Sequence, residues 1–282
     1  MNGYSLCIIG NSHTAAIKQA WTNRAPAVAP DFSLTFFAAR APQFKALDCR
    51  QSALVPSDGE FEDRLRMTSG GKDRIEIDRY DAFVLIGLGF RINMITLCGE
   101  CGVVEHLQWG PVERLLSHAC FASVIETALM DSVAIGLLDK IRAVSNRPVL
   151  ICPSPFRSEK ELRESPHRVR PRLSDAEFYR PIVAQTKAIA ERIAAERGGE
   201  MVWQDDATIA TPGFTKAEFA AGALRLQTPA GRTPGDDGQH MNEDFGALML
   251  SAILARLNAL SGGRVLAAPP RASAKRAGGR RA

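Results

Sequence analysis

The chain opens with a short apolar segment that ends in glycine and leads at once into a helical pattern. Leu6-Cys7-Ile8-Ile9-Gly10 is a continuous apolar run, which is typical of a strand buried on both faces. Between Ser12 and about Asn23, apolar side chains repeat at helical spacing: Ala16, Ile17, Ala20 and Trp21. A strand, a glycine turn and a helix in this order constrain the chain to a parallel sheet covered by helices.

The same alternation continues along the chain. Further apolar, strand-like runs predict a sheet of about five parallel strands: Tyr4–Ile9, Ser33–Phe37, Asp81–Ile86, Arg147–Cys152 and Met201–Gln204. Helices are expected over about 111–143 with a break near Ser117, from Ser174 to Gly198, and from a cap at Asn242 to Gly262. The predicted fold class is α/β, a three-layer α/β/α sandwich of flavodoxin-like type.

One stretch departs from this alternation. Residues 50–78 are polar and irregular, with Ser69-Gly70-Gly71 as a turn between two short predicted strands, Arg64–Met67 and Arg74–Ile77. We interpret this stretch as a small polar insertion in a single domain over residues 1–263. Residues 264–282 form a basic tail, predicted to be disordered because it is rich in Ala, Gly, Pro and Arg.

Length and composition fit one enzyme-sized domain. The chain has 282 residues, of which 45% are hydrophobic, enough for a substantial core. The net charge of +4 comes from the tail, because Pro269 to Ala282 holds five basic residues and no acid, which leaves −1 for the rest. A nucleic-acid partner is therefore not expected of the folded part.

No membrane partner is expected either. The sequence has no apolar run of 18 residues. Met1-Asn2-Gly3-Tyr4-Ser5 leads directly into a predicted strand, without a basic n-region or a cleavage site, so the expected location is cytoplasmic. The sequence leaves the oligomeric state open.

The cysteines do not predict a metal site. Cys98-Gly99-Glu100-Cys101 is followed by His106 and His118, but no second Cys-x-x-Cys pair follows at zinc-ribbon spacing. Cys7 and Cys152 lie in apolar strands, where cysteine behaves as a small core residue. We expect no metal and no organic cofactor.

Two short segments at opposite ends of the chain carry the chemistry. Gly10-Asn11-Ser12-His13 offers a hydroxyl at a helix N-terminus, and Asp237-Gly238-Gln239-His240 places a carboxylate three residues before an imidazole. Together they supply a nucleophile, a base and an orienting acid, the three parts of a serine acyl-transfer site. The competing interpretations are that Ser12 only caps the first helix and that the second segment is only a turn. Asp236 is the rival orienting acid.

These segments resemble the first and last blocks of the SGNH/GDSL hydrolase superfamily, with Asn11 where an aspartate usually stands. The resemblance implies a serine esterase in which Ser12, His240 and Asp237 form an acyl-enzyme on a small acyl ester. A carbohydrate O-acetyl group is the expected kind of substrate. The alternatives are an O-acyltransferase acting on a sugar or similar hydroxyl, and a non-catalytic binding module that retains the fold.

The oxyanion donors depart from the pattern of that superfamily. The backbone of Ser12 is one expected donor, and a second would come from the segment after the second strand, at Ala38, Ala39 or Arg40. The superfamily's Gly-x-Asn is replaced by Gly87-Leu88-Gly89-Phe90-Arg91-Ile92-Asn93. The candidates here are Gly89, Arg91 and, out of register, Asn93.

Candidate substrate-binding residues flank the two blocks. Asn11 and His13 adjoin the nucleophile, and Arg157 begins a basic loop over 153–173 that follows a predicted strand. A solvated loop is the alternative interpretation. The segment 208–234 is expected to cover His240 as a lid, and Trp109 and Phe90 are candidate sugar-stacking aromatics or core residues.

Overall fold

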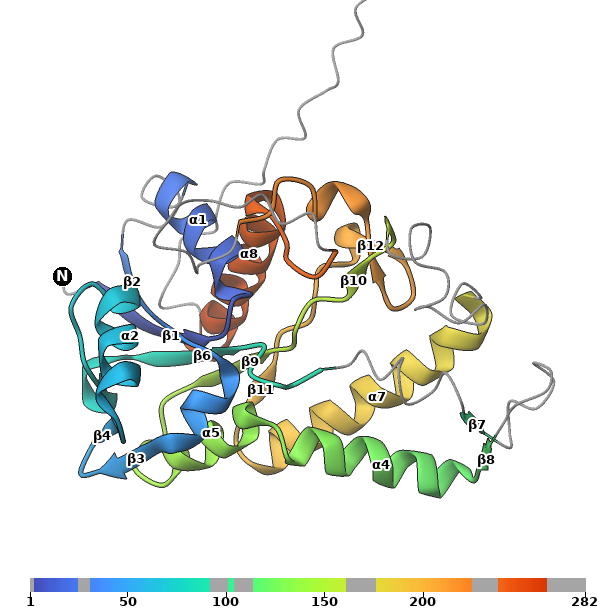
Figure 1. Ribbon diagram of the computed structural model, residues 1–282, viewed down its shortest axis with the longest axis horizontal. Coiled ribbons are helices and arrows are strands. Elements are labelled where there is room, and N and C mark those ends of the chain that lie inside the picture. The colour runs from blue at the N-terminus through green and yellow to red at the C-terminus, as the bar shows by residue number, and fades with distance from the viewer. Residues whose placement is uncertain are drawn as a thin grey trace, which may run out of the picture.

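A central parallel sheet organises the protein, as seen in a computed structural model (Figure 1). The structure describes residues 3–24, 31–91, 101–103, 114–160, 176–224 and 238–262. Its main sheet has five parallel strands in the order β11-β9-β6-β1-β2. These strands are Tyr4–Gly10 (β1), Phe32–Ala38 (β2), Ala82–Ile86 (β6), Val149–Cys152 (β9) and Glu200–Met201 (β11). The predicted three-layer α/β/α fold is therefore confirmed, with a shorter last strand than expected.

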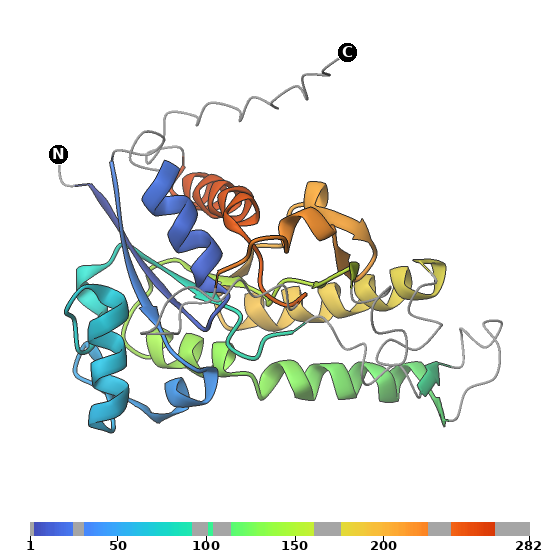
Figure 2. The ribbon, with the colours of Figure 1, turned by 45° about the horizontal axis from the view of Figure 1, so that its top comes forward.

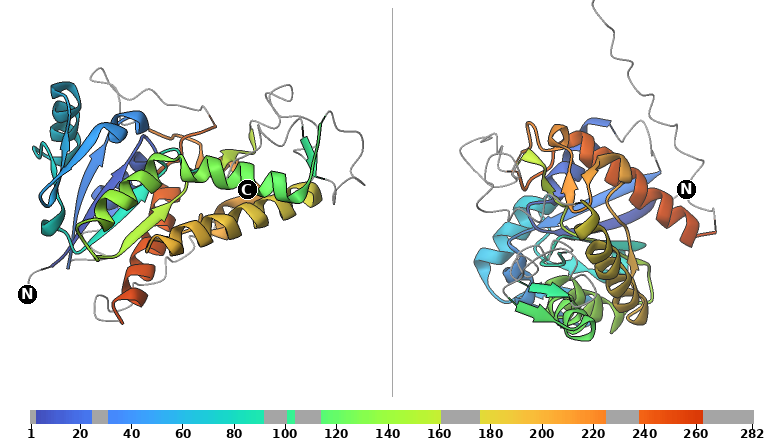
Figure 3. Two further views of the ribbon diagram at one scale, coloured as in Figure 1. Left: turned by 90° about the horizontal axis from the view of Figure 1, so that it is seen from below. Right: turned by 90° about the vertical axis from the view of Figure 1, so that its right-hand side faces the viewer.

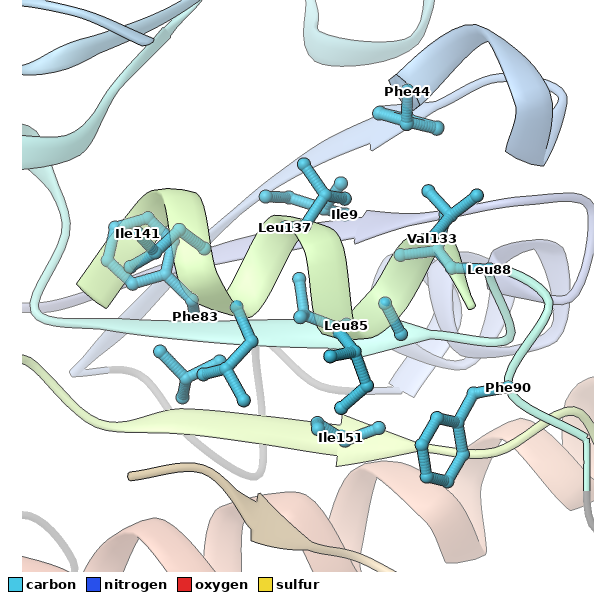
Figure 4. Close-up of a cluster of buried hydrophobic side chains, with 14 of the residues drawn as sticks. Ile9, Phe44, Phe83, Leu85, Leu88, Phe90, Val133, Leu137, Ile141 and Ile151 are labelled. Carbon is cyan, nitrogen blue, oxygen red and sulfur yellow. The ribbon is translucent and has the colours of Figure 1, made fainter. Parts of the chain in front are cut away.

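Strand alternation sends successive side chains of the sheet into two separate cores. On one face, Leu6 and Ile8 of β1 pack against α1 (Thr14–Arg24) and α8 (Glu243–Leu260), which lie side by side in Figure 2. On the other face, Cys7 and Ile9 pack with the core side chains of α5 (Val133–Arg142). Figure 4 shows Val133, Leu137 and Ile141 of that helix lying over Ile9, Leu85 and Ile151 of the sheet. Both cysteines of the predicted core, Cys7 and Cys152, are buried.

The predicted helices at the ends of the chain are confirmed by α1 and by α8, whose N-cap is Asn242. α7 (Ala176–Glu196) also forms as expected, with Pro181 inside it. A helix does begin at Ser117, which caps α4 (His118–Met130), but the helix predicted before it is wrong, because Arg114–Leu116 is a strand. A further break, which the sequence analysis does not predict, lies at Asp131-Ser132 before α5.

α4 and α7 pack side by side and run away from the sheet toward two short parallel strands (Figure 3). These strands are β7 (Cys101–Val103) and β8 (Arg114–Leu116). Among the described residues, no single helix meets the length and hydropathy expected of a membrane span; α4 and α5 do so only as a pair bent by 60°.

The stretch 50–78 is not an irregular insertion. Its centre is α2 (Gly59–Ser69), which begins where the Asp58 side chain accepts the Phe61 N–H at 2.8 Å and ends at Gly70, whose φ is +80°. The predicted strand Arg64–Met67 is therefore wrong. Because Phe61 and Leu65 are fully buried in the core beneath the sheet, the stretch is part of the packed domain and not a peripheral insertion.

A three-stranded antiparallel sheet is formed by the segments before and after α2 in the sequence. Its strands are Leu47–Arg50 (β3), Ala53–Pro56 (β4) and Ile75–Glu76 (β5), the last within the predicted strand Arg74–Ile77. Two 3₁₀ helices flank it, Ala41–Ala46 (η2) and Ile77–Arg79 (η3).

A second small sheet lies beyond β9 and β11. It contains Arg157–Ser158 (β10), Ile209–Thr211 (β12) and Phe214–Thr215 (β13), with 3₁₀ helices at Asp206–Thr208 (η6) and Ala217–Phe219 (η7). The Gln204 side chain ties these parts together, since its amide donates to the hydroxyls of Thr208 at 2.9 Å and Thr215 at 2.8 Å. The described part of the segment expected as a lid is thus a hydrogen-bonded unit with its own strands.

Candidate active site

The turn that carries Ser12 is placed by the register of the main sheet. Gly10, the last residue of β1, pairs with Ala38 of β2 on one side and Ile86 of β6 on the other. A Cβ atom at position 10 would lie 2.7 Å from the Ile86 carbonyl oxygen, so glycine is required for this close approach. Asn11 and Ser12 therefore emerge at the carboxyl edge of the sheet, where open α/β sheets bind ligands.

Ser12 and His240 meet at this edge. The Ser12 Oγ lies 2.8 Å from the His240 Nε2, although the two residues are 228 positions apart. Both residues are partly buried. With Nε2 unprotonated, the hydroxyl donates to the imidazole, which is the geometry of a nucleophile and its general base.

The helix cap is made by other groups than the Ser12 hydroxyl. The N–H of Thr14 donates to the Asn11 carbonyl and that of Ala15 to the Ser12 carbonyl, each at 3.1 Å. The Asn11 side chain accepts the N–H of His13, also at 3.1 Å. Because backbone carbonyls and Asn11 perform the capping, the Ser12 side chain is left to face His240.

The loop that carries His240 is held by a few polar anchors. Before the histidine, the Gly238 carbonyl accepts the N–H of Ser158 in β10 at 2.7 Å. After it, Met241 is buried, and the Asn242 side chain donates to the carbonyls of Glu218 at 2.8 Å and Ala221 at 3.0 Å. The same side chain accepts the Phe245 N–H at 3.2 Å and so caps α8.

Asn11 and His13 both lie next to the Ser12–His240 pair. The Asn11 amide fills the space beside Gly87, where a Cβ would come within 2.6 Å of the Asn11 Oδ1. The His13 ring lies 5.5 Å from the His240 ring, with an interplanar angle of 33°. Behind His13 is a cavity of about 30 Å³, room for about one water molecule, enclosed by residues including Ile86, Cys152 and Phe245.

The expected oxyanion donors after β2 are already occupied. The N–H groups of Ala38, Ala39 and Arg40 donate to the Thr68 hydroxyl at 3.0 Å, the Gly10 carbonyl at 3.1 Å and the Gln43 side chain at 3.1 Å, respectively. These groups are not available to a substrate in this structure.

The other candidate donors are placed differently. Within the described residues, the N–H groups of Ser12 and Gly89 have no hydrogen-bond acceptor, and Gly89 is exposed in a turn with a φ of +77°. Arg91 is exposed and does not line the small cavity beside Ser12. Asn93 lies outside the described residues.

Several predicted site residues also lie outside the described residues: Asp236, Asp237 and Trp109. Arg157 is described and partly buried in β10, next to Phe214 of β13, but most of its loop is not described. Phe90 is a fully buried core residue. Burial raises the pKa of the Cys152 thiol, so this cysteine near the site stays protonated and is a poor nucleophile.

Two contributions to the site escaped the sequence analysis. The first is Thr68, whose hydroxyl accepts the Ala38 N–H. A strand over 64–67, as the sequence analysis predicts, gives no reason to expect this contact. Asp58 as a cap, followed by Phe61, Leu65 and Thr68 at helical spacing, was the signal for α2. The second contribution is the pair of bonds from Asn242 to a distant segment, for which the sequence carries no signal.

No protein-family model matches this chain, and a comparison with curated proteins finds no match. Among solved structures, the chain is similar to an extracellular lipase from Streptomyces rimosus, with 11% identity over 91% of this chain and 99% of that one, and a TM-score of 0.41. It is also similar to the periplasmic domain of a lipopolysaccharide acetyltransferase from Salmonella ser. Paratyphi A, with 9% identity over 91% and 85% of the two chains and a TM-score of 0.40. At these values, the chemistry of this site has to follow from its own geometry.

Proposed function

We propose that this protein is a serine-dependent enzyme that hydrolyses a small acyl ester, with a carbohydrate O-acetyl group as the natural kind of substrate. The observation that carries the proposal is the 2.8 Å contact between the Ser12 Oγ and the His240 Nε2. Two segments so far apart in the chain form this contact at the edge of the sheet, and it supplies what a serine nucleophile requires.

In the proposed reaction, His240 accepts the proton of Ser12 as the Oγ attacks the ester carbonyl. The N–H groups of Ser12 and Gly89 are the donors proposed to stabilise the resulting oxyanion. The imidazolium then protonates the leaving alcohol, and an acyl group remains on Ser12. Water, deprotonated by His240, attacks this acyl-enzyme and releases the carboxylic acid. Asp237 is the residue proposed to orient the imidazole through Nδ1.

Covalent labelling tests this proposal directly. A fluorophosphonate should label the protein once, at Ser12, and a peptide map by mass spectrometry would locate the adduct. Ser12→Ala should lose the label and the hydrolysis of 4-nitrophenyl acetate while keeping the circular dichroism of the folded protein. Labelling at another residue, or unchanged turnover in Ser12→Ala, would reject the assignment. Analysis of products with and without added glucose would separate hydrolysis from transfer to a hydroxyl.

A further inference from the structure

A small cavity opens beside Ser12, between the turn after β1, the end of β2 and helix α2. Its wall includes Asn11 and Ser12 on one side, Ala38 and Ala39 at the end of β2, and side chains of α2. The cavity has a volume of about 10 Å³, at most room for one water molecule, so a substrate group would lie at its mouth. Because Ser12 lines this cavity, its other lining residues are the ones nearest to one side of an ester that Ser12 attacks.

Arg64 is the charged residue of that wall. It is partly buried, and its guanidinium forms no ion pair or hydrogen bond with any residue that the structure describes. Arg66, two residues later on the same helix, is different: it pairs with Glu62, with Asp63 at 3.2 Å and with Asp73 at 3.4 Å. Within the described region, helix α2 thus pairs Arg66 with carboxylates and leaves Arg64, which lines the cavity beside the nucleophile, without a carboxylate partner.

The surroundings of Arg64 strengthen its positive potential. No carboxylate lines the cavity among the described residues. A second cation lies next to it, because the Lys18 Nζ donates to the Thr68 carbonyl at 2.9 Å, and Thr68 lines the same wall. A guanidinium without a counter-ion is free to bind an anion, and its planar fork fits a carboxylate.

We propose that Arg64 binds a negatively charged group of the substrate, such as a carboxylate, close to the ester that Ser12 attacks. The inference rests on the proposed function, since it defines the substrate of that same site. Met67, whose exposed fraction is 57%, adds an apolar surface to the same wall. Arg64 and Met67 together select an acidic ester with a short apolar part and disfavour a fully neutral one.

Matched pairs of esters test the selectivity. In one pair the charge lies on the acyl side: 4-nitrophenyl hemisuccinate against the nearly isosteric, neutral 4-nitrophenyl levulinate. In the other it lies on the alcohol side: 4-acetoxybenzoate against 4-acetoxyacetophenone. For each pair, the measured quantity is the ratio of kcat/KM for the anionic ester to that for the neutral ester. Dividing the wild-type ratio by that of a variant cancels the intrinsic reactivity of the esters.

Three variants give the comparison. Arg64→Gln should lower the ratio of at least one pair by about 10- to 100-fold, which corresponds to the loss of a hydrogen bond to a charged group. Turnover of the neutral ester should be retained. Arg64→Lys should keep part of the preference, because the ammonium retains the charge but not the fork. Arg66→Gln is the control, since it removes the same charge from the same helix. Its ratios should stay within about two-fold of the wild type.

The outcomes separate this inference from the proposed function. Unchanged ratios for both pairs in Arg64→Gln, with Ser12-dependent turnover intact, would overturn the role of Arg64 alone. An equal fall of the ratios in Arg66→Gln would likewise overturn it, because the effect would then be one of net charge. Absence of turnover for every ester, together with no label on Ser12, would overturn the proposed function and this inference with it.

Discussion

The two halves of the candidate site are built in different ways. The Ser12 turn is fixed by backbone pairing, since Gly10 is held between β2 and β6 in a buried five-stranded sheet. The described part of the His240 loop is held by the Ser158 N–H at the Gly238 carbonyl, by the Asn242 side chain and by the buried Met241. The position of the nucleophile therefore follows from strand pairing in the sheet, whereas the position of the base depends on contacts between segments that are distant in the chain.

Replacing the two imidazoles one at a time should have the largest effect. His240→Ala should lower kcat/KM for 4-nitrophenyl acetate by about 100- to 10,000-fold, the usual contribution of a general base. His13→Ala should cost about ten-fold or less, because the contact shown between its ring and that of His240 is a ring contact at 5.5 Å. An equal loss in both variants would show that His13 shares the proton transfer.

Helix α1 follows the Ser12 turn and helix α8 follows the His240 loop, and the two helices pack against each other. A substitution at Gly246 should disrupt this packing. A Cβ there would overlap the carbonyl oxygen of Ala16, which is backbone and cannot move aside. Gly246→Ala should therefore lower the free energy of unfolding by about 1–3 kcal/mol in urea titrations. Gly136→Ala is the matched control in α5, because its Cβ would meet no atom within 4 Å. That control should stabilise the protein by about 0.4–1 kcal/mol; equal effects in both variants would contradict the predicted overlap.

A substitution at Asn242 can distinguish its role as the cap of α8 from its role in positioning His240. Asn242→Ser keeps a good cap for α8 but cannot donate to the Glu218 and Ala221 carbonyls. The unfolding free energy should fall by only about 1 kcal/mol. kcat should fall by about ten-fold or more, because a small displacement of a catalytic group is costly.

The control for this substitution is Asn258→Ser on the same helix, far from the loop in sequence. Asn258 is partly buried near the other end of α8 from this loop, so the kcat of this variant should stay within about two-fold of the wild type. A wild-type kcat in Asn242→Ser would show that Gly238 and Met241 suffice to hold the loop.

Arg91→Ala should have the smallest effect. The side chain is exposed and does not line the cavity beside Ser12, so kcat for 4-nitrophenyl acetate should change by less than about two-fold. A loss of ten-fold or more in kcat with an unchanged KM would restore Arg91 as an oxyanion donor. The nucleophile half of the site would then depend on an exposed side chain as well as on backbone.

Much of the fold was predictable because its signals are local. Continuous apolar runs gave the five strands, and the helical spacing before Gly262 together with Asn242 gave α8. The error at Arg64–Met67 arose because Ser69-Gly70-Gly71 was interpreted as a hairpin turn, whereas Gly70 is the end of a helix.

The sequence by itself determined the order of the five main-sheet strands, the helices α1, α7 and α8, and the residue types of the Ser12 and His240 segments, since these depend on neighbours along the chain. The tertiary structure alone decided which hydrogen-bond donors and charged groups at the site stay available to a substrate. The Thr68 hydroxyl accepts the Ala38 N–H, the Asn242 amide donates to the carbonyls of Glu218 and Ala221, and Arg64 lines the same cavity as Ser12. Hydrogen-bond partners and unpaired charges of this kind depend on contacts between segments distant in sequence, and only the packing of α2, η7 and α8 around the sheet brings those segments together.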